Sequence, residues 1–437
     1  MKYKLSQYVL DIKNPNDNNE IILFNTLSSG IASVSNNEFD ILKSEKLEGS
    51  TLDEFKALID EGFLVPTDRN EYEYIKYNEF LFQQNFNDDK YLSYVIAPTT
   101  ACNLRCKYCF ESGQNSKVFM TDETIDQIAK FILSDVERLK VKRVSIVWFG
   151  GEPLLCFKQI IKLGSTLKEK LYKLNVEFSS RIITNGILLT KDKTDALVEN
   201  CNLTTAQITL DGLEKQYCER KGASPENYKQ VIKNIIDAAE SIDINLRLNV
   251  DKLNASDMKE VANILFVENN LKDKIKLFFS QLRDYNGEDK QNKIYFTDDE
   301  YAEAKANFDK YLEQIKVKPT KKGVAAIPKY RPIYCALSHC NNYAIGPEGE
   351  LYKCEHYFGI KERIVGDVWH GLYYNNEYFK HINGVRHEIC SKCALYPICQ
   401  STCPETFRLI KFIDDKKCNR YDKLINMLHN IVLNNTK

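Results

Sequence analysis

The chain has 437 residues, a length that predicts about two to four domains. Its composition, 43% hydrophobic and 28% charged, is that of an ordinary globular protein, and its net charge of −1 excludes the strong positive field that drives nucleic-acid binding. Because the N-terminus lacks a signal-peptide core and no apolar run could cross a bilayer, we expect a cytoplasmic protein with no membrane or nucleic-acid partner.

Residues 1–90 predict a small α/β domain. Apolar and β-branched runs predict strands, and Ser28-Ser29-Gly30 predicts a hairpin turn. The strands are expected at 8–10, 21–24 and 63–65, and helices near 36–44 and 51–61. Three strands with helices give the shape of a winged helix. Asp and Glu outnumber Lys in this stretch, however, so it is a poor candidate for binding phosphate groups.

Residues 91–285 alternate strand-like and helical patterns. The strands are expected at 92–97, 144–149, 178–183, 206–210, 245–250 and 275–279. Amphipathic helices, such as 121–138 and 228–239, separate them. Repeated βα units predict a parallel sheet, and six strands are too few to close an eight-stranded barrel, so we expect an α/β fold with an open, partial (β/α)6 TIM-like barrel. The active site of such a fold lies at the carboxyl ends of the strands.

The last part of the chain predicts two further stretches. Residues 286–330 are polar and predict a bridging region with a helix near 298–315. Residues 331–437 are rich in cysteine and show little periodicity before a closing helix near 420–433. A segment with so little apolar pattern is expected to depend on bound metal for its folding.

The fourteen cysteines are unevenly spread. Eleven fall into clusters, and in a reducing cytosol clustered cysteines are more often metal ligands than disulfides. The other three, Cys156, Cys201 and Cys218, are isolated, and we expect them to be small structural residues.

The first cluster follows the first barrel strand. Cys102, Cys106 and Cys109 form a CxxxCxxC motif. Four thiolates would complete a zinc or iron–sulfur site, whereas three leave one metal position open for a further ligand. The alternative is an apolar helical stripe, because these offsets share one helix face. The entry through Pro98 and the polar residues between the cysteines favour a metal-binding loop.

This motif, with an aromatic residue before its last cysteine, resembles the signature of the radical-SAM superfamily. GGEP, ITNG, TLDG and RLNVD segments follow in order, each at an expected strand end, and TLDG is similar to the SLDG of the family. The resemblance assigns binding of S-adenosylmethionine (SAM) to Tyr108, Gly150, Gly151, Glu152, Pro153, Asn185, Thr209, Asp211, Arg247 and Asn249. The glycines would let backbone approach the ligand, and the Glu152 carboxylate would accept hydrogen bonds from its ammonium group.

The resemblance implies a radical-SAM oxidoreductase. A 4Fe–4S cluster on the three cysteines would bind the amino and carboxyl groups of SAM. One electron would then cleave SAM to methionine and a 5′-deoxyadenosyl radical, which abstracts a hydrogen atom from the substrate. The cofactor supplies the radical, and the protein orients it and excludes side reactions. An electron donor such as flavodoxin or ferredoxin is implied as a partner.

Eight further cysteines lie between Cys335 and Cys418. Their spacing resembles the SPASM extension of some radical-SAM enzymes, which carries two auxiliary 4Fe–4S clusters, although the spacing before Cys418 is shorter than usual. The resemblance assigns one cluster to Cys335, Cys340, Cys354 and Cys403, and the other to Cys390, Cys393, Cys399 and Cys418. Three 4Fe–4S clusters are therefore expected in all. The alternative is two structural zinc sites, because sets of thiolates suit both metals.

The N-terminal domain resembles the leader-recognition domain of SPASM peptide maturases. An extended leader can add a strand to an exposed sheet edge. We therefore expect 1–90 to recognise a ribosomal precursor peptide, 91–285 to form the radical-SAM barrel, 286–330 to bridge and 331–437 to form the SPASM domain. A purely structural role for the N-terminal domain is the alternative.

We expect the reaction to be a cross-link in the precursor peptide. An anaerobic sulfatase-maturating enzyme, which makes formylglycine, is the main rival. It is disfavoured by the long stretch before Cys102 and by Glu355, because those enzymes resemble one another in an Asp at this position. A metal-stabilised DNA-binding regulator is a remote alternative, which the acidic N-terminal domain disfavours.

Glu355 is the candidate catalytic residue because it directly follows Cys354. After hydrogen abstraction a proton must leave the substrate, and a carboxylate is a plausible base. The alternative is that Glu355 orients the cluster. A thioether is favoured over a carbon–carbon bond, although eight cysteines can fill both auxiliary clusters and leave no iron for a substrate thiolate.

Overall fold

The computed structural model describes residues 2–44, 47–49, 51–84, 91–109, 111, 117–282, 293–317, 327–399, 402–414 and 417–435. It divides into two compact units that each combine stretches distant in sequence. The first unit comprises Met1–Phe86, Gly323–Cys340 and Phe379–Lys437, and the second comprises Asn87–Lys322 and Asn341–Tyr378. The four domain ranges expected from the sequence remain a prediction.

The second unit is built on a parallel sheet whose six strands follow the chain order. They are β6 (Tyr91–Ile96), β7 (Arg143–Trp148), β8 (Glu177–Thr184), β9 (Leu203–Thr209), β10 (Asp243–Val250) and β11 (Ile275–Gln281). All neighbouring pairs are parallel, so the carboxyl ends of the strands share one edge. This confirms the predicted open barrel of six βα units.

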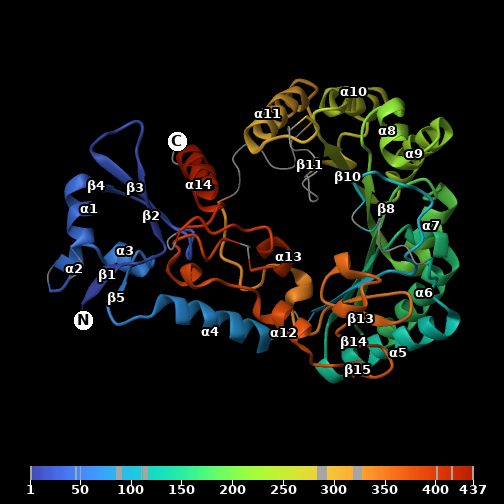
Figure 1. Ribbon diagram of the computed structural model, residues 1–437, viewed down its shortest axis with the longest axis horizontal. Coiled ribbons are helices and arrows are strands. Elements are labelled where there is room, and N and C mark those ends of the chain that lie inside the picture. Colours follow the sequence, from blue (N-terminus) through green and yellow to red (C-terminus); the bar gives the residue numbers. More distant parts are fainter. Residues whose placement is uncertain are drawn as a thin grey trace. The chain divides into compact units, whose positions relative to one another are not determined.

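Helices cover the outer side of this curved sheet, as Figure 1 shows. They are α5 (Asp122–Leu139), α6 (Phe157–Lys173), α7 (Lys191–Cys201), α8 (Glu214–Lys221), α9 (Pro225–Ala238) and α10 (Met258–Asn263). In α5, Thr121 caps the first turn, and Ile125, Ile128, Ile132 and Val136 are buried. This spacing of three and four residues places one apolar face against the sheet. The predicted helices at 121–138 and 228–239 are confirmed.

The sheet continues beyond β6 with four short strands from the C-terminal region. They are β12 (Tyr343–Ile345), β13 (Glu350–Tyr352), β14 (Gly366–Asp367) and β15 (Gly371–Leu372). Strand β12 pairs in parallel with β6, and the other three follow as antiparallel partners. The sequence did not predict these strands, because two or three residues are too few to show an alternating pattern.

Helix α11 (Asp298–Gln314) confirms the helix predicted for the bridging region. Its capping box joins Thr297 and Glu300, the sequence signal for a helix start. The rest of the predicted bridge at 286–292 and 318–326 lies outside the described residues.

The first unit begins with a three-stranded antiparallel sheet and short helices. The sheet has the order β2 (Val9–Lys13), β3 (Glu20–Asn25), β4 (Ile31–Ser35), and β1 (Tyr3–Leu5) pairs with β5 (Leu64–Pro66). The helices are α1 (Asn36–Lys43), α2 (Thr51–Glu54), α3 (Lys56–Asp60) and α4 (Glu71–Gln84). The three predicted strands, the hairpin turn and the helix at 36–44 are confirmed, and the helix expected at 51–61 is divided into α2 and α3. Strands β1 and β4 and helix α4 were not predicted.

Both faces of the three-stranded sheet are covered. On one face Leu23 and Val34 pack against the buried side chains of the following helices, such as Phe39 and Leu42. On the other face Leu10, Ile12, Ile22 and Phe24 pack against Leu395, Leu428 and Val432. Leu428 and Val432 belong to α14 (Tyr421–Asn435), the closing helix that the sequence predicted. The N-terminal sheet and the C-terminal helix therefore share one hydrophobic core.

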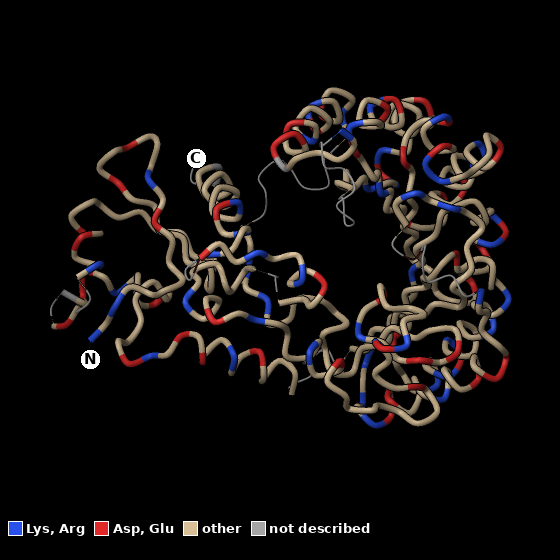
Figure 2. The backbone as a smooth tube through the Cα atoms, in the orientation of Figure 1, with Lys and Arg blue, Asp and Glu red and all other residues tan. Residues whose placement is uncertain are grey.

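Charged residues of both signs are interspersed along the backbone of both units, as Figure 2 shows. In the described part of the chain no helix combines the length and the apolar character that a bilayer crossing requires.

Candidate functional site

The three cysteines of the first motif follow β6 at the carboxyl edge of the sheet. Their loop is held by the last residues of α8, because Arg105 N–H donates to the Lys221 carbonyl and Lys107 N–H to the Arg220 carbonyl, each at 3.0 Å. Gly222, with a φ of 62°, ends this helix beside Arg105. The motif is therefore an ordered loop outside any helix, which excludes an apolar helical stripe.

Burial is the main cause that raises the pKa of the Cys102 thiol to about 11, with smaller contributions from nearby Glu152, Cys106 and Cys109. Burial likewise raises the pKa of Cys106 and of Cys109. The thiols act on one another electrostatically, so they share one environment. Without metal they keep their protons, and binding of a metal would release them.

The described residues include no group of three or more His, Cys, Asp or Glu side chains that could hold a single metal ion. A cubane cluster differs from one ion because each thiolate binds a different iron. The three thiols suit such a cluster by their chemistry, since thiolates are the ligands of iron–sulfur clusters.

The two glycines of the GGEP motif bring two loops together. Gly150 has a φ of 107°, and a Cβ added there would collide with the Thr99 carbonyl. A Cβ on Gly151 would collide with the carbonyl of Ala101. Glu152 N–H donates to this Ala101 carbonyl at 2.8 Å. In the structure the glycines therefore let the backbone approach the loop that enters the cysteine motif.

Glu152 is fully buried and joins two strand ends. Its Oε1 accepts hydrogen bonds from the Leu154 N–H at 3.1 Å and the Thr184 hydroxyl at 2.8 Å, and its Oε2 accepts from the Asn185 N–H at 2.9 Å. Burial raises the pKa of Glu152 in spite of these bonds. Because a carboxylate offers about four acceptor positions, about one remains for a ligand.

Neighbouring residues complete this corner. Pro153 opens a short 3₁₀ turn after Glu152 and is buried. The Asn185 side-chain amide donates to Asn103 Oδ1 at 2.7 Å, which ties the third strand end to the cysteine loop.

The fourth strand end carries a buried ion pair. Lys221 Nζ lies 3.5 Å from Asp211 Oδ2 and donates to the Thr209 hydroxyl at 2.6 Å. The Tyr108 hydroxyl donates to the same Asp211 oxygen. Burial and the Asp211 carboxylate raise the pKa of Tyr108, so the hydroxyl keeps its proton. The other oxygen, Asp211 Oδ1, is buried and has no hydrogen-bond partner in the described part of the chain.

The fifth strand supplies the last two predicted side chains. Arg247 Nε donates to Asn249 Oδ1 at 2.9 Å, and the Asn249 amide lies 3.5 Å from the Tyr108 hydroxyl. The structure thus brings Tyr108, Asp211 and Asn249 into contact. The Asn254 side-chain amide joins the fourth and fifth strand ends, because it donates to the backbone carbonyls of Asp211 and Asn249, each at 2.9 Å.

Sequence reasoning missed Arg220, Lys221 and Asn254. Arg220 pairs with the buried Asp251 at 2.8 Å, and Lys221 is 1% exposed. The only signal for the two cations was their place at the end of the helix that follows the TLDG segment. Surface helices often end with basic residues, so the sequence could not reveal that these are buried.

Four cysteines of the C-terminal region also share one environment. Cys399 and Cys418 act electrostatically on Cys390, and Cys390, Cys399 and Cys418 act on Cys393. Burial is the main cause that raises the pKa of both thiols, and the pKa of Cys393 reaches about 12. These are the four residues that the resemblance assigned to one auxiliary cluster, and they all lie in the first unit.

The other predicted set is divided between the units. Cys335, Cys340 and Cys403 belong to the first unit and Cys354 to the second. Glu355 follows Cys354 in a 3₁₀ turn and is half-buried. The ring of Phe358, three residues later, lies 6.3 Å from that of Phe149, which directly precedes the GGEP motif. The turn that carries Glu355 is therefore attached to the carboxyl end of β7.

The isolated cysteines lie apart from these groups. Cys156 and Cys201 are buried, and burial raises the pKa of Cys156 to about 11 and that of Cys201 to about 12. Cys201 packs against Gly164, where a Cβ would collide with its sulfur. Cys218 is half-buried on α8.

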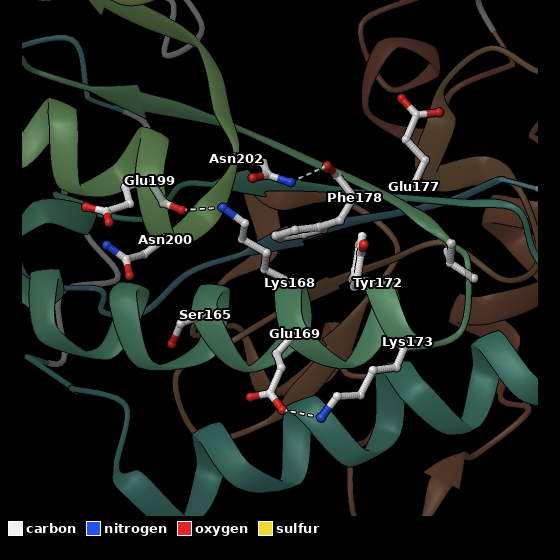
Figure 3. Close-up of a pocket in the computed structure, with 11 residues that line it drawn as sticks. Ser165, Lys168, Glu169, Tyr172, Lys173, Glu177, Phe178, Glu199, Asn200 and Asn202 are labelled. Carbon is white, nitrogen blue, oxygen red and sulfur yellow. Dashed lines mark hydrogen bonds and ion pairs between the residues drawn. The ribbon is translucent and has the colours of Figure 1, made fainter.

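A hollow of about 660 Å³ lies at the other end of the strands, between α6, the end of α7 and the start of β8 (Figure 3). Lys168 crosses it and donates to the Glu199 carbonyl, and Lys173 pairs with Glu169 at 2.5 Å. None of the predicted site residues lines this hollow.

Residues 96–265 match the family model described as the Radical SAM superfamily. A curated relative, the radical SAM cyclopropyl synthase TigE of Paramaledivibacter caminithermalis, is 25% identical over 214 residues, covering 43% of this chain and 44% of the relative. A probable GTP 3′,8-cyclase of Methanococcus vannielii is 32% identical over 148 residues, covering 33% and 45%. The chain thus spans less than half the length of these two relatives.

Two solved structures share the fold. Native anSMEcpe with bound AdoMet is 19% identical, with a TM-score of 0.56 over 79% of this chain and 100% of that chain. Streptococcus suis SuiB bound to S-adenosylmethionine is 18% identical, with a TM-score of 0.53 over 92% and 95%. The family model thus identifies a radical SAM domain at residues 96–265, and the similarity to the two solved structures shows that the chain shares their fold.

Proposed function

We propose that the chain is a radical-SAM peptide maturase that installs a cross-link in a ribosomal precursor peptide. The observation that supports the radical-SAM chemistry is the position of the three half-buried thiols near Asp211. The Asp211 carboxylate acts electrostatically on Cys106, and its Oδ1 is buried without a partner in the described residues. A buried polar atom without a partner is costly unless a ligand satisfies it. This strand edge is also where such folds place their ligands.

The superfamily implies a 4Fe–4S cluster and SAM as cofactors. When bound, they supply one-electron cleavage of SAM to a 5′-deoxyadenosyl radical. Cys102, Cys106 and Cys109 would hold the cluster. Asp211 would accept hydrogen bonds from SAM through Oδ1, and Glu152 through its remaining acceptor position.

The other predicted side chains would shape the same pocket. Tyr108 and Asn249 already contact one another at the end of the fifth strand. Thr209 is held by Lys221, and Asn185 by Asn103, so both are fixed before SAM arrives. Arg247, Gly150, Gly151 and Pro153 complete the SAM site that we propose.

We propose two auxiliary 4Fe–4S clusters on the remaining eight cysteines. The grouping of Cys390, Cys393, Cys399 and Cys418 in one environment supports the second cluster. The first cluster, on Cys335, Cys340, Cys354 and Cys403, rests on the resemblance to the SPASM extension. A low-potential donor such as flavodoxin or ferredoxin would supply the electrons.

The peptide substrate is supported by the N-terminal sheet. Its outer strands, β2 and β4, pair only with β3 among the described residues, so each has an edge that an extended leader could join. The similar enzyme SuiB of Streptococcus suis has been solved in complex with a precursor peptide, SuiA. A leader bound at this sheet would hold the precursor on the enzyme during the reaction.

For the bond itself we favour a thioether, with a carbon–carbon bond as the alternative. The test is mass spectrometry of the precursor after reaction with SAM and a reductant. Either cross-link removes two hydrogens, so alkylation of free thiols distinguishes them. Loss of one alkylatable cysteine per cross-link is expected. Full alkylation after the mass loss would contradict the thioether, and a formylglycine product would support the sulfatase-maturating alternative.

GTP cyclisation is a second candidate because several curated relatives are probable GTP 3′,8-cyclases. The same reduced protein should be incubated with SAM and GTP. We expect no GTP-dependent product. Turnover of GTP in the absence of any peptide would replace the maturase proposal.

A further inference from the structure

Helix α4 contacts two cysteine-bearing loops that follow it by more than 250 residues in the sequence. Figure 1 shows α4 running beside the C-terminal loops of the first unit. Its apolar side contributes Ile75, which is buried in one cluster with Tyr8 and Tyr396, and Cys390 and Cys393 pack against this cluster. The helix therefore borders the proposed ligands of the second auxiliary cluster.

Glu79 makes the charged contact between α4 and this loop. Its Oε2 lies 2.5 Å from Arg386 Nη2, and its Oε1 accepts from the Tyr396 hydroxyl at 3.2 Å. Arg386 Nε donates to the Tyr396 hydroxyl as well. Three side chains thus close a hydrogen-bonded ring around the segment that contains Cys390 and Cys393.

The ring is largely withdrawn from solvent. The Arg386 and Glu79 side chains are 21% and 20% exposed. The charge of Arg386 also acts on the thiol of Cys390. Removing the carboxylate would leave a desolvated cation without its partner beside this ligand, and such an unpaired buried charge is strongly destabilising. Charges near a cluster also set its reduction potential.

Gln83, one turn further along α4, holds the other loop. Its amide donates to the Ser338 carbonyl at 2.9 Å and accepts from the Cys340 N–H at 3.0 Å. The Cys340 thiol lies 3.6 Å from the Gln83 carbonyl. A single side chain therefore fixes both ends of the turn that leads into Cys340.

We propose that Glu79 and Gln83 are positioning residues for the auxiliary clusters, so that α4 holds the ligand loop of Cys390 and Cys393 through one contact and that of Cys340 through the other. This inference rests on the proposed clusters. It makes the N-terminal part of the chain a requirement for cluster assembly as well as for peptide recognition.

The test compares Glu79→Gln and Gln83→Leu in the full-length, anaerobically reconstituted protein. Iron per chain, electron paramagnetic resonance and the midpoint potential of each cluster are measured. The SAM cluster lies in the other unit and serves as an internal reference. Glu73→Gln and Gln84→Leu are matched controls, because both residues are exposed on the same helix and contact neither loop.

We expect each α4 variant to lose up to about a third of the iron, or to shift the midpoint potential of one auxiliary cluster, while the SAM cluster keeps its signal. The controls should match the wild type. Exchanging the charges in the double variant Glu79→Arg, Arg386→Glu should restore part of the loss. Tyr396→Phe removes only hydroxyl contacts and gives a milder test if Glu79→Gln is insoluble.

Full iron and unchanged potentials in Glu79→Gln, Tyr396→Phe and Gln83→Leu would overturn the inference, as would an equal loss from all three clusters. A wild-type protein that binds iron only at the first motif would instead overturn the proposed auxiliary clusters, and the inference with them.

Discussion

Lys221 and Asp211 form an ion pair that is closed to solvent, with side-chain exposures of 1% and 0% and 3.5 Å between Nζ and Oδ2. The pair joins the end of α8 to the end of β9, and the backbone of α8 in turn holds the cysteine loop. The charge of Lys221 is also felt by Cys106. One lysine thus connects the fourth strand end with the proposed cluster loop.

Lys221→Met should lower the free energy of unfolding by about 3–5 kcal/mol, because it leaves the buried Asp211 carboxylate without its cation. Chemical denaturation of the purified protein measures the change. Lys215→Met, at an exposed position on the same helix, is the control and should change stability by less than about 0.5 kcal/mol. Equal stability of the two variants would contradict the structural role of the pair.

The leader site can be tested without disturbing the core. Deleting the N-terminal sheet would uncover Leu428 and Val432, so a truncation would change folding as well as recognition. A lysine on an edge strand blocks strand addition instead. Ser33→Lys on β4 and Asp11→Lys on β2 replace exposed residues.

One of these two variants should weaken precursor binding by at least about 2 kcal/mol, measured by calorimetry, while SAM cleavage without peptide continues. Asn16→Lys, in the exposed turn between β2 and β3, controls for the added charge. Wild-type affinity in both edge variants would contradict strand addition at this sheet.

Glu355→Gln tests the proposed base. Iron content and 5′-deoxyadenosine formation should stay unchanged, whereas product formation should slow by about 10²–10⁴-fold, the usual contribution of a general base. Product is followed by mass spectrometry in single turnovers. Glu362→Gln, at an exposed position in the next turn, should behave as the wild type. A wild-type rate in Glu355→Gln would show that the carboxylate is not the base.

The start of α11 predicts a pH dependence of stability. Glu300 accepts from Lys252, with 2.7 Å between Nζ and Oε1, and from the Thr297 N–H at 2.8 Å. The hydrogen bond from Lys252 is the main cause that lowers the pKa of Glu300 from 4.5 to about 2, and the Thr297 N–H contributes less. Because the folded-state pKa is the lower one, ionised Glu300 stabilises the fold above about pH 4.5, and this contribution is lost as the pH falls toward 2.

Glu300→Gln should therefore be less stable than the wild type at pH 6, and the difference should shrink as the pH is lowered from 4.5. Thermal unfolding of both proteins across this range measures it. A difference that is independent of pH would show that the carboxylate charge does not stabilise α11.

The six barrel strands and their main helices could be predicted because their apolar residues repeat over five or more positions. The strands β12–β15 could not, since each has only two or three residues. Strand β12 is placed by pairing with β6, and each of the others is placed by pairing with the strand before it. Helix α4 was missed because aromatic residues lie on all its sides, including the exposed Tyr77 and Phe80. Its contacts come from residues far away in the sequence.

The candidate site could likewise be predicted from the sequence only in part. The motifs located the strand ends, and the structure brings Tyr108, Asp211 and Asn249 together as neighbours. The sequence could not show that Glu152 binds three protein donors or that Gly150 faces the Thr99 carbonyl, because both facts depend on how two loops meet. Lys221 was missed because burial of a charge at a helix end leaves no sequence pattern.

The most direct measurement is iron and SAM cleavage in the anaerobically reconstituted protein, compared with the triple variant Cys102→Ala, Cys106→Ala, Cys109→Ala. We expect about twelve irons per wild-type chain, because eleven thiolates and one open iron match three cubanes. The triple variant should keep about two thirds of this iron and form no 5′-deoxyadenosine. Stoichiometric zinc without iron–sulfur absorbance in the wild type, or SAM cleavage by the triple variant, would contradict the central claim.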